Sequence, residues 1–189
     1  EAADAYSKII ASVGEPKREH WALYYYRGMS YERAKQWPLA EKDFQQALKL
    51  SPDNYQVLNY LGYSWVDQDV NLEPALDMIR KAVALRPKDG YIVDSLGWAY
   101  YRLGRYEEAV AELEKAIVLS PSDPTINDHL GDAYWKTDRK LEATYQWKRA
   151  IEMKPEPEDL VKIQRKLKEG LTDGPVPTRA EEPKKPDRG

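Results

Sequence analysis

Residues 90–123 read GYIVDSLGWAYYRLGRYEEAVAELEKAIVLSPSD, and this stretch decides the fold. Its first half places Val93, Leu96 and Tyr100 on one face at helical spacing, and its second half does the same with Leu113 and Ile117. A Leu-Gly-Arg turn separates the two halves, and a Ser-Pro pair ends the second. The stretch therefore predicts two antiparallel helices joined by a tight turn.

The same design occurs four times along the chain, with one glycine, two alanines and one proline in fixed order. Successive glycines in this pattern are 34, 35 and 34 residues apart. The columns are Gly28, Gly62, Gly97 and Gly131; Ala40, Ala75, Ala109 and Ala143; Ala47, Ala82, Ala116 and Ala150; and Pro52, Pro87, Pro121 and Pro155. Small residues allow the helices of one unit to approach closely where they cross. A period near 34 with these columns predicts a stack of helix pairs.

These columns resemble the tetratricopeptide repeat, and the resemblance covers residues 21–157. It implies an all-α fold, an α-α superhelix of antiparallel helix pairs, in which Trp65 and Trp147 occupy core columns. The expected organisation is a partial repeat at 1–20, repeats at 21–54, 55–89, 90–123 and 124–157, a C-terminal capping helix at 158–171 and a disordered tail at 172–189.

The two ends of the chain differ from the repeats. Residues 2–12 look like the second helix of an earlier repeat, so we infer a C-terminal piece of a longer protein, because repeat arrays need capped ends. Residues 158–170 form an amphipathic pattern with an apolar face opposite the charged side chains Lys162, Arg165, Lys166 and Lys168, which predicts a solvated cap. Prolines among alternating charges predict disorder from Thr172 onward.

Composition excludes several kinds of site. The net charge of −3 and a pI near 5.6 give no electrostatic reason to expect nucleic acid. Cysteine is absent, the two histidines are not paired at metal-binding spacing, and no apolar run is long enough to span a membrane. Asp67, Asp69 and Asn71 alternate as in a calcium loop, but the loop glycine and terminal glutamate are missing, which favours a polar turn. We therefore expect no metal and no cofactor.

The resemblance also implies a binding site, because the first helix of each tetratricopeptide repeat lines a concave face. The groove residues implied are Asn59, Tyr63, Asp94, Trp98, Tyr101, Asp128, His129, Asp132 and Trp135. Aromatic rings would supply apolar contact area, and carboxylates would accept N–H groups or pair with basic side chains. Chaperone-binding members hold a terminal carboxylate with basic residues in these columns, and the aspartates here exclude that use. The groove suits a protein or peptide partner with apolar anchors and some basic character.

The same residues allow two other interpretations, a hydrolase site and a glycan-binding groove. Ser95, His129 and Asp94 form a possible hydrolase constellation, but neighbouring first helices lie about 10 Å apart and a helical face offers no oxyanion hole. Catalysis is therefore not expected. A glycan-binding groove remains an alternative, because aromatic rings beside aspartates suit sugars. Arg27 replaces the leucine usual in the family and suggests a solvated or partner-facing edge.

Segments 94–105 and 127–135, and less closely segment 58–65, resemble the repeats of bacterial envelope proteins. Among these are outer-membrane lipoprotein adaptors that assemble with a carboxy-terminal processing protease and present cell-wall hydrolases to it. This resemblance implies a protease or cell-wall hydrolase as partner and a periplasmic or outer-membrane-associated location. The alternative location is cytoplasmic.

Overall fold

The computed structural model describes residues 2–171, within which the regular structure is ten α-helices and one short 3-10 helix. The expected all-α superhelix of antiparallel pairs is confirmed; the tail at 172–189 lies outside the described residues. The helices are α1 Ala2–Ser12, η1 Arg18–His20, α2 Trp21–Arg33, α3 Trp37–Leu50, α4 Tyr55–Asp67, α5 Leu72–Leu85, α6 Gly90–Arg102, α7 Tyr106–Leu119, α8 Pro124–Lys136, α9 Lys140–Glu152 and α10 Pro157–Glu169.

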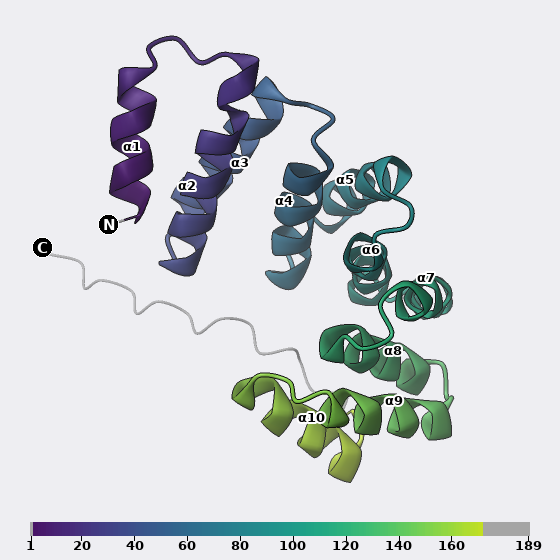
Figure 1. Cartoon of the computed structure of the whole chain (residues 1–189). Helices are drawn as coiled ribbons and strands as arrows, with labels where there is room; N and C mark the ends of the chain where they lie inside the picture. The colour runs from purple at the N-terminus through teal and green to yellow at the C-terminus, as the bar shows by residue number, and fades with distance from the viewer. Residues whose placement is uncertain (1, 172–189) are drawn as a thin grey trace, which may run out of the picture.

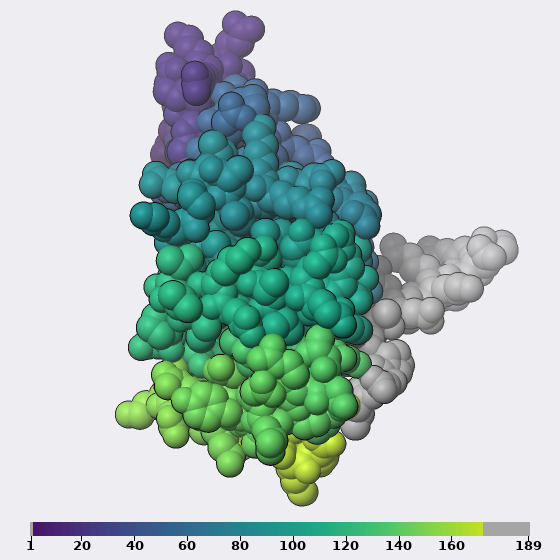
Figure 2. Space-filling view, turned by 90° about the vertical axis from the view of Figure 1, so that its right-hand side faces the viewer, coloured from purple at the N-terminus to yellow at the C-terminus, as the bar shows by residue number. Residues whose placement is uncertain are grey.

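The helices follow a curved path, with α4, α6 and α8 on its inner side and α5 and α7 on its outer side (Figure 1). Each pair packs on the next in sequence order, so the colour runs continuously along the long axis (Figure 2). The helix α1 packs on α2 at one end, and α10 packs on α9 at the other. The pairs α2–α3, α4–α5, α6–α7 and α8–α9 fall within 21–54, 55–89, 90–123 and 124–157, which we keep as proposed repeat boundaries.

Local sequence sets the ends of the helices. Asn54, Asp89 and Asp123 precede α4, α6 and α8, and each side chain accepts hydrogen bonds from two backbone N–H groups of the first turn. The turn inside each pair has a residue in the left-handed region at the same place in every unit, and the α4–α5 turn has a second one, Asn71. The residues at this shared place are Lys35, Asp69, Gly104 and Asp138, with φ of 58°, 60°, 74° and 62°.

The glycine column marks the crossing point of each pair. A Cβ atom on Gly97 would lie 2.5 Å from Cγ of Leu113, and one on Gly131 would lie 2.5 Å from Cδ1 of Trp147. Such distances are far inside van der Waals contact, so only glycine permits the observed approach of the helices.

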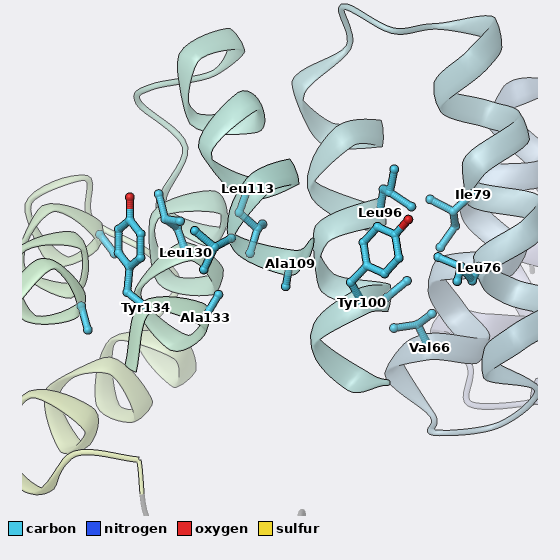
Figure 3. Packing of buried hydrophobic residues seen from close by; sticks show 14 of the residues in the cluster. Val66, Leu76, Ile79, Leu96, Tyr100, Ala109, Leu113, Leu130, Ala133 and Tyr134 are labelled. Atoms are coloured by element: carbon cyan, nitrogen blue, oxygen red, sulfur yellow. The ribbon is translucent and has the colours of Figure 1, made fainter. Parts of the chain in front are cut away.

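The core consists of buried apolar clusters that follow one another along the stack, linked by partly buried residues such as Trp65 and Val83. Leu96 and Tyr100 of α6 face Val66, Leu76 and Ile79 of the preceding pair (Figure 3). Further apolar side chains extend this cluster to Ile163 of the cap. Trp65 packs against this cluster and also against a second cluster, which is formed by residues of α2, α3 and α4. The helices therefore stabilise one another through nearest neighbours.

Polar contacts join neighbouring pairs as well, and each joint uses different residues. The hydroxyl of Tyr60 donates to Glu32 at 2.8 Å, and the indole of Trp65 donates to Glu41 at 3.0 Å. Further along the stack, Arg102 forms an ion pair with Asp69, and Tyr134 and Arg139 both donate to Glu114.

Arg27 is an internal residue, so the expectation of a solvated or partner-facing edge is wrong. Its guanidinium donates to both carboxylate oxygens of the buried Asp43, at 2.6 and 2.7 Å, and to Oγ of Ser7 at 3.1 Å. It also lies near the rings of Tyr24 and Tyr31. Arg27 therefore ties α1 and α3 to α2.

In the described part of the chain, every helix is too short or too polar to cross a bilayer.

Candidate partner-binding groove

Two clefts lie along the inner side of the curve. The inner cleft, of about 410 Å³, is lined by residues of α4, α6, α8 and α10, and the side cleft, of about 240 Å³, lies between α4 and the first turns of α6 and α8. They share Tyr63 and Thr125, so they form one groove. Of the nine groove residues expected from the sequence, Asn59, Tyr63, Asp94, Trp98, Asp128, His129 and Asp132 line one or both clefts.

Tyr101 and Trp135 line neither of these clefts, because other side chains hold them. The Tyr101 ring stacks on Trp98 with centroids 4.7 Å apart. The Trp135 ring lies against Trp147 at 5.3 Å, and Nζ of Lys140 lies 4.1 Å from its centre. These two residues support the groove by packing.

Asp94 and His129 form a buried pair that joins α6 to α8. Nδ1 of His129 lies 3.0 and 3.1 Å from the two carboxylate oxygens and donates to them. The imidazole also stacks on Trp98, with ring centres 4.0 Å apart. Burial lowers the pKa of His129, but Asp94 and then Asp128 and Asp132 raise it by more, so the net change is upward.

This pair predicts a measurable effect of pH. Asp94→Asn removes the largest favourable charge and should lower the pKa of His129. Because the folded-state pKa is raised, His129 stabilises the fold below its ordinary pKa, and this contribution is lost as pH rises through the folded value. NMR titration of the imidazole measures the pKa in both proteins. An unchanged or higher value in the variant would contradict this role for Asp94.

The chain offers an internal control for that titration. His20, the other histidine of the chain, directly precedes α2, whereas His129 lies on α8. The helices α2 and α8 are far apart in the array (Figure 1). The ring resonances of His20 should not differ between the two proteins at any given pH.

Lys166 of α10 forms ion pairs with Asp128 and Asp132, two of the residues that the sequence places in the groove. Its Nζ lies 2.8 Å from both carboxylate oxygens of Asp128 and 2.8 Å from Oδ2 of Asp132. Oδ1 of Asp132 accepts from the indole of Trp147 at 2.9 Å. The expectation of a solvated Lys166 is therefore wrong, and Asp128 and Asp132 are already paired within the chain.

The environment of Asp132 is unusual for a carboxylate. Burial, followed by the charge of Asp128, raises its pKa to about 6, although Lys166 opposes this change. The pKa of Lys166 is raised because the two carboxylates outweigh its burial. At this end of the groove, the charges of Asp128 and Lys166 therefore act on Asp132, and the charges of the two aspartates act on Lys166.

Two buried polar atoms in the groove have no hydrogen-bond partner within residues 2–171. They are Nε1 of Trp98, which lines the inner cleft, and Oδ1 of Asn59, which lines the side cleft. One is a donor and the other an acceptor. Buried polar groups are rarely left unpaired, so both point to a bound polar partner or water.

The possible hydrolase constellation does not form. Oγ of Ser95 donates to the carbonyl of Tyr91 at 3.0 Å, while His129 faces Asp94.

The turn that resembles a calcium loop is stabilised by an ion pair, in which Nη2 of Arg102 lies 3.3 Å from Oδ1 of Asp69. Within the described range 2–171, His, Asp and Glu side chains form no group of three that could hold a metal ion.

Comparisons with known proteins agree with the repeat architecture. A family model described as tetratricopeptide repeat matches residues 21–54, and one described as TPR repeat matches residues 97–138. A TPR repeat-containing protein of Pseudomonas aeruginosa is 38% identical over 87 residues, which are 46% of this chain. The matched region spans only 15% of that relative.

Solved structures share the fold at low identity. A thermophilic TPR protein of Thermus thermophilus has a TM-score of 0.70 and 20% identity, covering 87% of this chain and 88% of that one. MamA of Desulfovibrio magneticus RS-1 has a TM-score of 0.63 and 20% identity, covering 81% and 95%. Repeat models match residues 21–54 and 97–138 and these solved structures share the superhelix, so the chain contains tetratricopeptide repeats.

Proposed function

We propose that this chain is a non-catalytic scaffold that holds an extended segment of a partner protein along the side cleft and the inner cleft. The fold favours protein binding in general, and the unpaired Asn59 Oδ1 and Trp98 Nε1 carry the more specific proposal. An extended segment presents alternating N–H and C=O groups along its length. One N–H can donate to Asn59, and one C=O can accept from Trp98.

The charges of the inner cleft favour a basic segment. Asp67 and Glu156 have neither an ion pair nor a side-chain hydrogen bond within residues 2–171. Of the three lysines that line the cleft, Lys162 and Lys166 pair with its aspartates, and Lys154 has no ion pair among the described residues. The negative charge of the cleft also affects Tyr63, because burial and then the charges of Asp94 and Asp67 raise the pKa of its hydroxyl. A Lys or Arg of the partner would find carboxylates here that the chain itself leaves unpaired.

Two of the aromatic rings on which the glycan-binding alternative depends are already engaged within the chain. A sugar needs a free aromatic face, whereas Trp98 already stacks on Tyr101 and His129. Trp135 is likewise engaged by Trp147 and Lys140.

A more specific role, as an adaptor for a carboxy-terminal processing protease of the bacterial envelope, rests on the resemblance of segments 94–105 and 127–135. Titration of such a purified protease, or of its cell-wall hydrolase substrate, against this chain tests the role directly. Absence of binding at micromolar concentration would reject this adaptor role for the chain and leave the general scaffold role standing.

The groove itself is tested with a displayed library of random dodecapeptides. We expect the selected peptides to bind Trp98→Phe about two- to tenfold more weakly, because phenylalanine keeps an aromatic ring but has no N–H to donate. Fluorescence anisotropy gives the Kd. Trp37→Phe, in α3 and outside both clefts, is the matched control and should bind as the original does. Equal affinity of Trp98→Phe and the original would argue against the groove.

A further inference from the structure

A third hollow, which we call the edge pocket, lies where one helix pair connects to the next. It has a volume of about 610 Å³ and lies between the last turns of α5 and α7 and the first turns of α4 and α6. Leu85, Tyr91 and Leu119 line it and are 44%, 62% and 39% exposed. Single exposed apolar residues are common, but three around one hollow form a patch that suits a partner side chain.

The rim of the edge pocket is positively charged. The guanidinium of Arg86 lies 4.5 Å from the centre of the Tyr55 ring, and Lys88 follows two residues later. Neither cation forms an ion pair with a carboxylate of residues 2–171. The adjacent Asp89 uses its carboxylate as the cap of α6, accepting from the N–H groups of the first turn. The pocket therefore combines an apolar floor with two unpaired cations.

The edge pocket adjoins the groove. Tyr91 lines both the edge pocket and the side cleft, and the side cleft shares Tyr63 and Thr125 with the inner cleft. The three hollows therefore follow one another from α10 to the turn between α5 and α6. Within residues 2–171, two unpaired carboxylates, Asp67 and Glu156, and one unpaired cation, Lys154, lie at the α10 end of this series, whereas two unpaired cations, Arg86 and Lys88, lie at the other.

We infer that the bound segment crosses Tyr91 and ends in the edge pocket, where it places an aliphatic or aromatic side chain next to an acidic residue. This inference rests on the proposed function of the groove and adds the order of charges along the partner. The basic end of the segment lies at Asp67 and Glu156, and its apolar and acidic end lies at Leu119, Arg86 and Lys88. Rim charges of this kind act mainly on specificity.

Charge reversal tests the inference. Random dodecapeptides are selected on the original chain and, separately, on the double variant Arg86→Glu, Lys88→Glu. The original should select an apolar residue beside Asp or Glu, and the variant should select Lys or Arg at that same position. A synthetic peptide from the first selection should bind the variant about tenfold more weakly in 0.15 M salt, and its charge-swapped form should regain the affinity.

Two further variants complete the design. Tyr91→Ala should weaken the same peptide about fivefold or more, with a melting midpoint within about 2 °C of the original, since the ring is mostly exposed. The double variant Lys42→Glu, Lys49→Glu changes the net charge equally, on exposed positions of α3 outside all three hollows, and should leave the affinity unchanged.

The outcomes separate the two proposals. Two outcomes would overturn the edge pocket. In one, peptides selected on the Arg86→Glu, Lys88→Glu variant still carry Asp or Glu at that position. In the other, the peptide selected on the original chain binds both this variant and Tyr91→Ala with unchanged affinity. Weaker binding by Trp98→Phe in either case leaves the groove intact. A library that yields no binder at all overturns both.

Discussion

Replacing Trp147 by alanine is expected to lower the free energy of unfolding of the C-terminal helix pairs by about 3–5 kcal/mol. The side chain is completely buried, and its ring fills the space that Gly131 leaves open on α8. Its Nε1 also donates to the buried Asp132. The variant therefore creates a cavity and removes one of the hydrogen bonds of a buried carboxylate.

The predicted mechanism can be isolated by a double-mutant cycle. Gly131→Ala should destabilise the original protein, because the new Cβ would lie 2.5 Å from the Trp147 ring, but should have little effect when Trp147 is already alanine. Repeat arrays need not unfold in one step, so urea denaturation is combined with hydrogen exchange of α8, α9 and α10. Equal effects of Gly131→Ala in both backgrounds would show that the two residues do not share this space.

Replacing Lys166 by methionine is expected to lower the stability of the cap by up to about 3–5 kcal/mol at neutral pH. The variant leaves Asp128 and Asp132 partly or wholly buried without their shared cation. Its effect should be smaller near pH 5, because Asp132 already has a raised pKa and loses the cation that opposes this rise. A carboxyl with a raised folded-state pKa stabilises the fold while protonated, and this stabilisation is lost as pH rises through that value.

Chemical denaturation at pH 5 and pH 8 measures this difference. Lys162→Met is the matched control, because Lys162 lies one turn earlier on α10 and pairs with the exposed Asp159. Little change is expected there, as for other surface ion pairs. A Lys166→Met variant that is as stable as the control at pH 8 would contradict the bridging role.

The repeat architecture could be predicted from the sequence because its columns report on close contacts. Gly97 and Gly131 are required wherever two helices cross with no room for a Cβ atom, and Trp147 fills its core column as expected. Such constraints act within one unit, so they recur every 34 or 35 residues and are visible in a single sequence.

The pairing of groove side chains could not be predicted in this way, because it joins different units. On the helix wheel of α10 alone, Lys166 falls on the charged face, yet it lies 34 residues after Asp132 and bonds to it. Asp94 and His129 are 35 residues apart. Extending the repeat period into α10 would have indicated the Lys166 contact. Family comparison alone also misplaced Arg27, whose partner Asp43 lies on the other helix of its pair.

The polar joints described above mean that the array is uniform in backbone but not interchangeable in its parts. Tyr60 with Glu32, His129 with Asp94, and Lys166 with Asp132 each connect only one pair of neighbours. Shuffling, duplicating or deleting a unit would preserve the glycine and alanine columns but bring together faces whose buried charges lack counterparts. The order of the units is thus encoded in their chemistry, and evolution by gain or loss of whole repeats would be restrained in this part of the protein.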